Sequence, residues 1–75
     1  MATTSQEIRE HDVVRLRRGV GKWAAAREGT VVAEKGNWRL VEIADDRGVT
    51  LDLISVREAD LDVVWKPGWP APPSH

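Results

Sequence analysis

The middle of the chain contains short stretches in which apolar and polar side chains alternate. In residues 12–16, Val14 and Leu16 share one side while Val13 and Arg15 share the other, which is the period of a β-strand. Further stretches of strand character occupy residues 29–34, 38–44, 49–54 and 61–65. The pattern therefore predicts five short strands.

Glycine and polar residues separate these stretches. Residues 35–37 and 45–48 each have the composition of a tight hairpin turn. Residues 17–28 exceed the length of an ordinary hairpin connection and form a long first loop. Ser55, followed three residues later by Glu58, has the spacing of a capping box, which predicts a single 3₁₀ turn before the last strand.

This succession of elements predicts an all-β fold, a small five-stranded SH3-like partly open barrel. We expect the barrel to span residues 11–65, after a flexible N-terminus at residues 1–10. Residues 66–75 contain four prolines and form a Pro-rich tail, in which neither a strand ladder nor a helix persists. The expected core consists of the apolar residues on the inward side of the strands: Val14, Leu16, Val31, Ala33, Val41, Ile43, Leu51, Leu53, Val56, Leu61 and Val63.

The chain is short and has no cysteine. A length of 75 residues allows one domain, which buries only about 60% of the surface that its unfolded form exposes. Neither a disulfide nor a thiolate metal site supports so thin a core. The N-terminal residues do not have the pattern of a secretory signal, and every apolar run is too short to cross a bilayer. We therefore expect a soluble cytoplasmic protein without a membrane partner.

Charge is unevenly distributed along the chain, although the net charge is only −1. Residues 1–39 carry eight Lys or Arg and five Asp or Glu, a balance of +3, whereas residues 40–75 carry three and seven, a balance of −4. Such a basic half either binds a phosphate backbone or pairs with the acidic half inside one fold. The basic residues in and beside the first loop surround Trp23 and are Arg15, Arg17, Arg18, Lys22 and Arg27.

Several runs of the sequence resemble a known family. The runs HDVVRL at residues 11–16 and EGTVV at 28–32 look like the first two strands of family 4926 of the domains of unknown function, very short bacterial proteins. The runs VEIAD at 41–45 and GVTL at 48–51, and then Leu61, look like its later strands. The resemblance implies an SH3-like fold, no known catalytic residues, and a larger protein partner in a pair like that of a toxin and its antitoxin. The same pattern resembles KOW-type barrels, which implies contacts with RNA.

Residues suited to catalysis or metal binding are sparse. Asp45 and Asp46 are adjacent carboxylates, but they lie in an expected turn, where Asp forms local hydrogen bonds. The two histidines, His11 and His75, lie at opposite ends of the sequence and have no metal-ligand spacing. We therefore predict a protein that is not an enzyme and has no metal and no cofactor.

Tryptophan is the only aromatic residue type, with four copies. A small core seldom needs four indoles, and Trp is enriched at interaction hot spots. We predict a protein-interaction module that binds an unidentified protein through Trp23, Trp38 and the basic residues of the first loop. Trp69 is included among the predicted binding residues because it lies in a proline-rich segment, and such segments can dock in aromatic-lined grooves. The alternative is a KOW-like nucleic-acid-binding domain that uses the same loop on RNA.

Overall fold

Five antiparallel strands and one 3₁₀ turn make up the fold. The computed structural model describes residues 7–70, and none of these belongs to a helix long and apolar enough to span a membrane. The elements in chain order are β1 (Val13–Leu16), β2 (Glu28–Lys35), β3 (Trp38–Ala44), β4 (Thr50–Arg57), the 3₁₀ turn η1 (Glu58–Asp60) and β5 (Leu61–Trp65). The all-β prediction is confirmed, and β3 and β5 have the predicted bounds.

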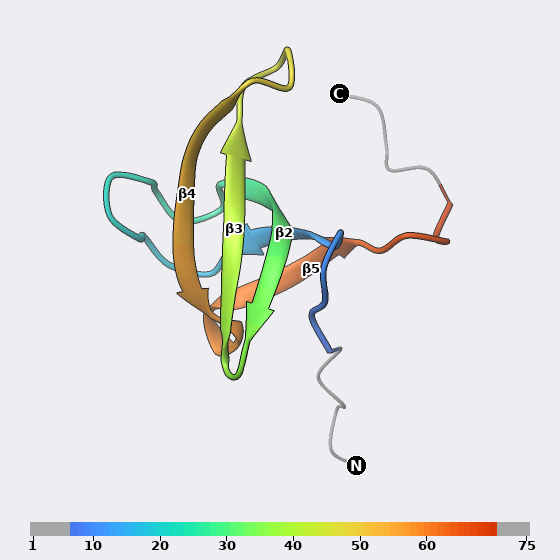
Figure 1. Cartoon of the computed structure of the whole chain (residues 1–75). Helices are drawn as coiled ribbons and strands as arrows, with labels where there is room; N and C mark the ends of the chain where they lie inside the picture. The colour runs from blue at the N-terminus through green and yellow to red at the C-terminus, as the bar shows by residue number, and fades with distance from the viewer. Residues whose placement is uncertain (1–6, 71–75) are drawn as a thin grey trace.

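The strands form one sheet in the order β4-β3-β2-β1-β5. Figure 1 shows β2, β3 and β4 side by side, with β1 and β5 crossing behind them. The two edge strands, β4 and β5, do not pair with each other, so the sheet curls without closing. This arrangement is consistent with a small, partly open barrel.

A single cluster of buried apolar side chains joins the strands. It includes seven of the expected core residues: Val14, Leu16, Val31, Val41, Ile43, Val56 and Leu61. Ala33 and Val63 are half-buried instead. The strand periodicity therefore identified most of the core correctly.

The predicted capping box at Ser55 is wrong. β4 continues through this position to Arg57, and Ser55 pairs with Leu40 of β3. The 3₁₀ turn begins only at Glu58, without a side-chain hydrogen bond at its cap. Strand pairing with β3 provides more backbone hydrogen bonds at Ser55 than a short capped turn would, which explains the longer strand.

The longer β4 also reverses the predicted orientation of two leucines. Leu51 and Leu53 were expected in the core, but they are 49% and 51% exposed. Side chains alternate along β4 from Asp52 to Val56, beyond an irregularity in the β3–β4 pairing that skips Leu51, and Val56 is buried. Asp52 and Ile54 therefore face inwards with Val56, and the two leucines face outwards.

The segment before β1 is part of the fold, in contrast to the expected flexibility of residues 1–10. Ile8 is buried in the core, its N–H donates to Glu58 Oε2 (3.0 Å) and its carbonyl accepts from Arg39 Nε (2.6 Å). Arg39 is 6% exposed and its Nη2 lies 3.2 Å from Glu58 Oε2. A second ion pair joins the buried Asp12 to Lys66. Residues 1–6 lie outside the described residues.

Gly29 allows β2 to approach β3 closely. A Cβ atom at this position would lie 2.6 Å from Val41 Cγ1 and 2.7 Å from the Glu42 carbonyl oxygen. Only glycine permits this approach, and the same residue pairs with Val14 of β1 on the other side. Gly29 thus lets β2 connect the two parts of the curled sheet.

Candidate functional site

Trp23 of the first loop is a packing residue. Its ring packs against the core, and its Nε1 donates a hydrogen bond to Asp52 Oδ2 of β4 (2.8 Å). The Lys22 Nζ and the Arg27 Cζ lie over the ring, 5.1 and 4.9 Å from its centroid. The predicted grouping of Lys22, Trp23 and Arg27 is therefore real, but the indole N–H and much of the ring already have partners within the fold.

The other predicted basic residues pair with carboxylates. Arg15 lies 3.0 Å from Glu28, Arg17 lies 3.0 Å from Asp62, and Arg18 lies 3.1 Å from Asp60. These contacts neutralise three of the five cations assigned to the first loop and its flanks. Two of these three contacts, those of Arg17 and Arg18, join the basic half of the sequence to its acidic half inside one fold, whereas Arg15 pairs within the basic half.

Trp38 has a different environment. It is the first residue of β3 and lies next to the buried Arg39, so strand alternation turns it to the outer face of the sheet. Its side chain is 44% exposed, and the Arg57 guanidinium lies 5.1 Å from the ring centroid. Lys35 of β2 pairs with Trp38 across the hairpin. A large aromatic ring is therefore displayed between two cations.

Trp38 contributes to a groove on the β2–β3 hairpin. The groove has a volume of about 760 Å³ and is open to solvent. Its lining residues are Ala33, Glu34, Lys35, Gly36, Asn37, Trp38, Arg39, Leu40 and Ser55. Most of the lining surface is apolar, and Glu34 is occupied by a hydrogen bond from the Glu10 N–H to its Oε2 (3.0 Å). We call this feature the hairpin groove.

Arg39 supports the hairpin groove from the inner face. Its Nη1 donates to the carbonyl oxygens of Gly36 (2.7 Å) and Trp38 (2.8 Å), at the tip of the hairpin. The Glu58 N–H also donates to the Asn37 carbonyl (2.8 Å). These bonds hold the turn that positions Trp38, so the groove is a preformed surface.

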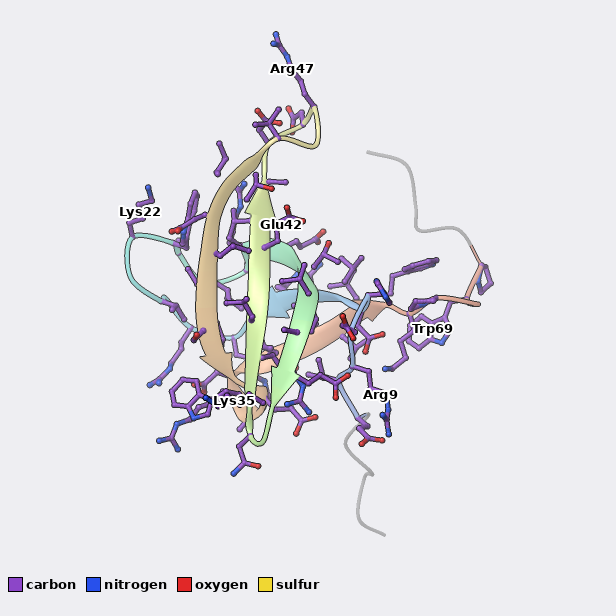
Figure 2. The ribbon with its side chains drawn as sticks, viewed as in Figure 1. Arg9, Lys22, Lys35, Glu42, Arg47 and Trp69 are labelled. Atoms are coloured by element: carbon purple, nitrogen blue, oxygen red, sulfur yellow. The ribbon has the colours of Figure 1, made fainter. Side chains whose placement is uncertain are left out.

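Trp69 lies elsewhere. Figure 2 shows it beside the chain that follows β5, on the opposite side of the molecule from Lys22 and the first loop. The Trp69 N–H donates to the Lys66 carbonyl (3.0 Å), and Trp65 Nε1 donates to the Pro70 carbonyl (2.7 Å). Residues 66–70 therefore form a turn that packs on Trp65, and residues 71–75 lie outside the described residues.

The eight predicted binding residues thus divide among four places: the Trp23 cluster, the ion-paired arginines, the hairpin groove and the tail. Sequence reasoning missed Lys35 and Arg57, which flank Trp38, and the exposed Leu51 and Leu53. The detectable signal was the alternation of side chains from Asp52 to Val56. Without the capping box this segment is one strand, and its alternation places Asp52 on the same inner face as Val56.

Among the described residues, the titratable side chains do not form a metal site, and one exposed ion pair shifts a pKa. Among residues 7–70, no group of three His, Cys, Asp or Glu side chains could hold a metal ion. The hydrogen bond from Arg9 to Glu7 (2.7 Å), and then the charge of Glu7, raise the pKa of the Arg9 guanidinium. This exposed pair precedes β1 and is not part of the hairpin groove, as the Arg9 and Lys35 labels of Figure 2 show.

No protein-family model, curated protein or solved structure matches the chain. The resemblance to family 4926 therefore stays a prediction, and the geometry of the molecule is the basis for a function.

Proposed function

We propose that the chain is a non-catalytic protein-interaction domain whose hairpin groove binds an acidic, extended segment of a partner protein. The observation that carries the proposal is Trp38, an exposed indole on a preformed hairpin between Lys35 and Arg57. One apolar side chain of the partner would cover the Trp38 ring, and neighbouring carboxylates would meet the two cations.

Trp38 has the properties of an interface anchor. Exposed indoles are uncommon on surfaces that stay in water, whereas Trp and Arg dominate binding hot spots. Because Arg39 already fixes the hairpin, little conformational entropy remains to be lost when a partner binds. The groove is open to solvent, so a substrate within it would keep its water, which is unfavourable for catalysis.

The charges around the groove favour an acidic partner. Among residues 7–70, the cations that form no ion pair are Lys22, Arg27, Lys35, Arg47 and Arg57. Two of these five flank Trp38, whereas Glu34, the carboxylate in the groove lining, accepts a backbone hydrogen bond. Cations at the rim of an interface steer an acidic partner and exclude a basic one.

RNA binding through the first loop is the weaker candidate. Arg15, Arg17 and Arg18 would have to release their carboxylate partners before they could contact phosphates. Trp23 would have to release Asp52 before its ring could stack fully on a base. A larger protein partner, which the resemblance to family 4926 implies, agrees better with the hairpin groove.

A peptide-selection experiment tests the proposal. A random linear peptide library is selected on the full chain, and the affinity of the enriched peptides is measured by fluorescence anisotropy. We expect enrichment of an apolar residue flanked by Asp or Glu. The Trp38→Ala substitution should weaken binding about tenfold or more, as loss of a hot-spot residue does.

Trp69→Ala is the matched control, because Trp69 is also exposed but lies outside the groove. Its affinity should equal that of the unmodified chain. A library without enrichment, or enriched peptides that bind the Trp38→Ala chain equally well, would contradict the proposal. A short single-stranded RNA is measured in parallel, and binding that is lost in Lys22→Ala rather than Trp38→Ala would favour the nucleic-acid alternative.

A further inference from the structure

A shift in strand register shapes the hairpin groove. The pairing of β2 with β3 slips by one residue between Val31 and Ala33. Unbroken alternation from the buried Val31 would turn both Ala33 and Lys35 to the inner face. After the shift, Ala33 pairs with Leu40 on the outer face, and Lys35 pairs there with Trp38. Such bulges re-aim side chains and are common beside functional sites.

Two rows of side chains therefore cross the outer face at the hairpin end of the sheet. Strand pairing forms the Trp38 row from Lys35, Trp38 and Arg57, and the Leu40 row from Ala33, Leu40 and Ser55. The residues that alternate with them, Arg39, Val41 and Val56, are buried, so both rows face outwards. The two rows lie about 6.8 Å apart, the length of two residues along a strand.

The Leu40 row forms a hollow beside the Trp38 ring. Leu40 is half-buried and makes the floor, and the small side chains of Ala33 and Ser55 stand on either side of it within the groove lining. The Cα atoms of Ala33 and Ser55 are two strand spacings apart, roughly 10 Å, which leaves room for one bulky apolar side chain. A larger residue at position 33 or 55 would fill this space.

We propose that Ala33 and Ser55 are specificity-determining residues of the hairpin groove, because they admit one bulky apolar side chain of the partner over Leu40 and against the Trp38 ring. The partner carries an acidic residue two positions away, which meets a cation of the Trp38 row. Side chains on one face of an extended segment repeat about every 6.8 Å, the separation of the two rows. This inference rests on the proposed function and specifies the ligand of that site.

Glu42 restricts the position of the acidic residue. It lies two residues beyond Leu40 on β3, on the opposite side from the Trp38 row, and Figure 2 shows it farther along the sheet than Lys35. Its Oε2 accepts from the Thr50 hydroxyl, and it forms no ion pair with residues 7–70. A partner carboxylate on that side would be repelled. The groove therefore selects a segment with its acidic residue on one side of the apolar residue.

Filling the hollow tests the selection by size. Ser55→Leu and Ala33→Leu each place a leucine beside Leu40 and keep Trp38 and both cations. An acidic peptide selected on the unmodified chain is compared with a version in which alanine replaces its bulky apolar residue, by fluorescence anisotropy. The unmodified chain should bind the alanine version about tenfold or more weakly, because the hollow is then left empty.

The filled variants should lose this discrimination. Binding of the bulky peptide should weaken about tenfold or more, because its side chain clashes with the new leucine, whereas binding of the alanine version should change less than about twofold. Thr50→Leu is the matched control, since Thr50 is on the same strand as Ser55, is also exposed and lies outside the groove. It should leave both affinities unchanged. Circular dichroism checks the fold of each variant, and Ser55→Leu, at an exposed position, suffices if Ala33→Leu does not fold.

The possible outcomes separate this inference from the proposed function. If the filled variants bind the bulky peptide as tightly as the unmodified chain does, or lose both peptides equally, the size selection is overturned. Binding that is still lost in Trp38→Ala would then leave the proposed function standing. If no peptide depends on Trp38, the proposed function is contradicted and the inference falls with it.

A second acidic residue tests the role of Glu42. It is added to the selected peptide two positions from the apolar residue, on the side that lacks one, so that one carboxylate faces Glu42 in either direction of the peptide. We expect severalfold weaker binding to the unmodified chain and restored binding to Glu42→Gln. Unchanged or tighter binding of the doubly acidic peptide to the unmodified chain would overturn the assigned orientation.

Discussion

Trp23 and Trp38 each lie beside an arginine guanidinium but have different structural roles. Each indole has an Arg guanidinium about 5 Å from its ring centroid: Arg27 over Trp23 at 4.9 Å and Arg57 over Trp38 at 5.1 Å. The Trp23 ring packs against the core, and its N–H is bonded to Asp52. Trp38 is 44% exposed, and its N–H donates no hydrogen bond to residues 7–70.

The difference shows that a tryptophan surrounded by cations does not by itself identify a binding site. Trp23 lies over the inner face of β4, where an inward carboxylate accepts its N–H. Trp38 lies on the outer face of β3, where the residues across the hairpin are exposed and charged. The face of the strand therefore determines whether the indole stabilises the fold or is available to a partner.

The largest effect is expected at Arg39, which supports the hairpin on the Trp38 side. Arg39→Met removes four hydrogen bonds and leaves Glu58 without its cation. The free energy of unfolding should fall by about 3 kcal/mol, the lower end of what breaking a buried ion pair costs. Urea denaturation followed by circular dichroism measures it. Arg57→Met, at an exposed site, is the control, and an equal loss in both variants would disprove the supporting role of Arg39.

The comparison itself is tested by replacing each tryptophan. Trp23→Ala should lower the free energy of unfolding by about 2–3 kcal/mol, less than full burial would imply because Trp23 is half-buried. Trp38→Ala should change it by no more than about 0.5 kcal/mol, as is usual for surface positions. Both values come from urea denaturation. If Trp38→Ala were the more destabilising variant, the assigned roles would be reversed.

A smaller effect is expected at Asp52, which distinguishes the two indoles. Asp52→Ala removes the acceptor of the Trp23 N–H and should lower the free energy of unfolding by about 1 kcal/mol, as loss of one hydrogen bond does. Asp46→Ala, in the exposed β3–β4 turn, is the control and should be neutral. Chemical denaturation of both variants measures their free energies of unfolding. No difference between them would mean that the bond does not hold the first loop.

The smallest effect is expected at the ion-paired arginines. Arg17→Gln removes an exposed contact with Asp62 and should cost less than about 1 kcal/mol, a loss that added salt should reduce further. Thermal unfolding at low and high salt measures it. A larger loss that persists in salt would show that Arg17 has a structural role beyond this ion pair.

The strands and the site differ in how far sequence could predict them. Alternation at Val14 and Leu16 depends on local sequence alone, and the strands and most of the core followed from it. The face of Leu51 could not be predicted once a turn was assumed at Ser55, because the turn broke the strand alternation that links the preceding residues to the buried Val56. The burial of Arg39 also could not be predicted, since an isolated arginine is expected at the surface until its partners are known.

The site depended on contacts between distant residues. Trp23 and Asp52 are 29 positions apart, and Arg17 and Asp62 are 45 apart in the sequence. No local pattern links such residues, so the first loop appeared available for binding when its side chains already had partners. Trp38 was predicted as a binding residue. Lys35 and Arg57 were not, because only the pairing of β2 and β4 with β3 brings them beside Trp38.

Indole N–H signals provide the most direct test of the Trp38 surface. Two-dimensional ¹H–¹⁵N spectra of the full chain resolve the four indoles, each assigned by a Trp→Phe substitution. An acidic peptide from the selection described above is then titrated into the sample. We predict that the Trp38 indole signal shifts first and furthest, while the Trp23 signal, bonded to Asp52, stays in place. A titration in which Trp23 shifts and Trp38 does not would contradict the assignment of the hairpin groove as the binding surface.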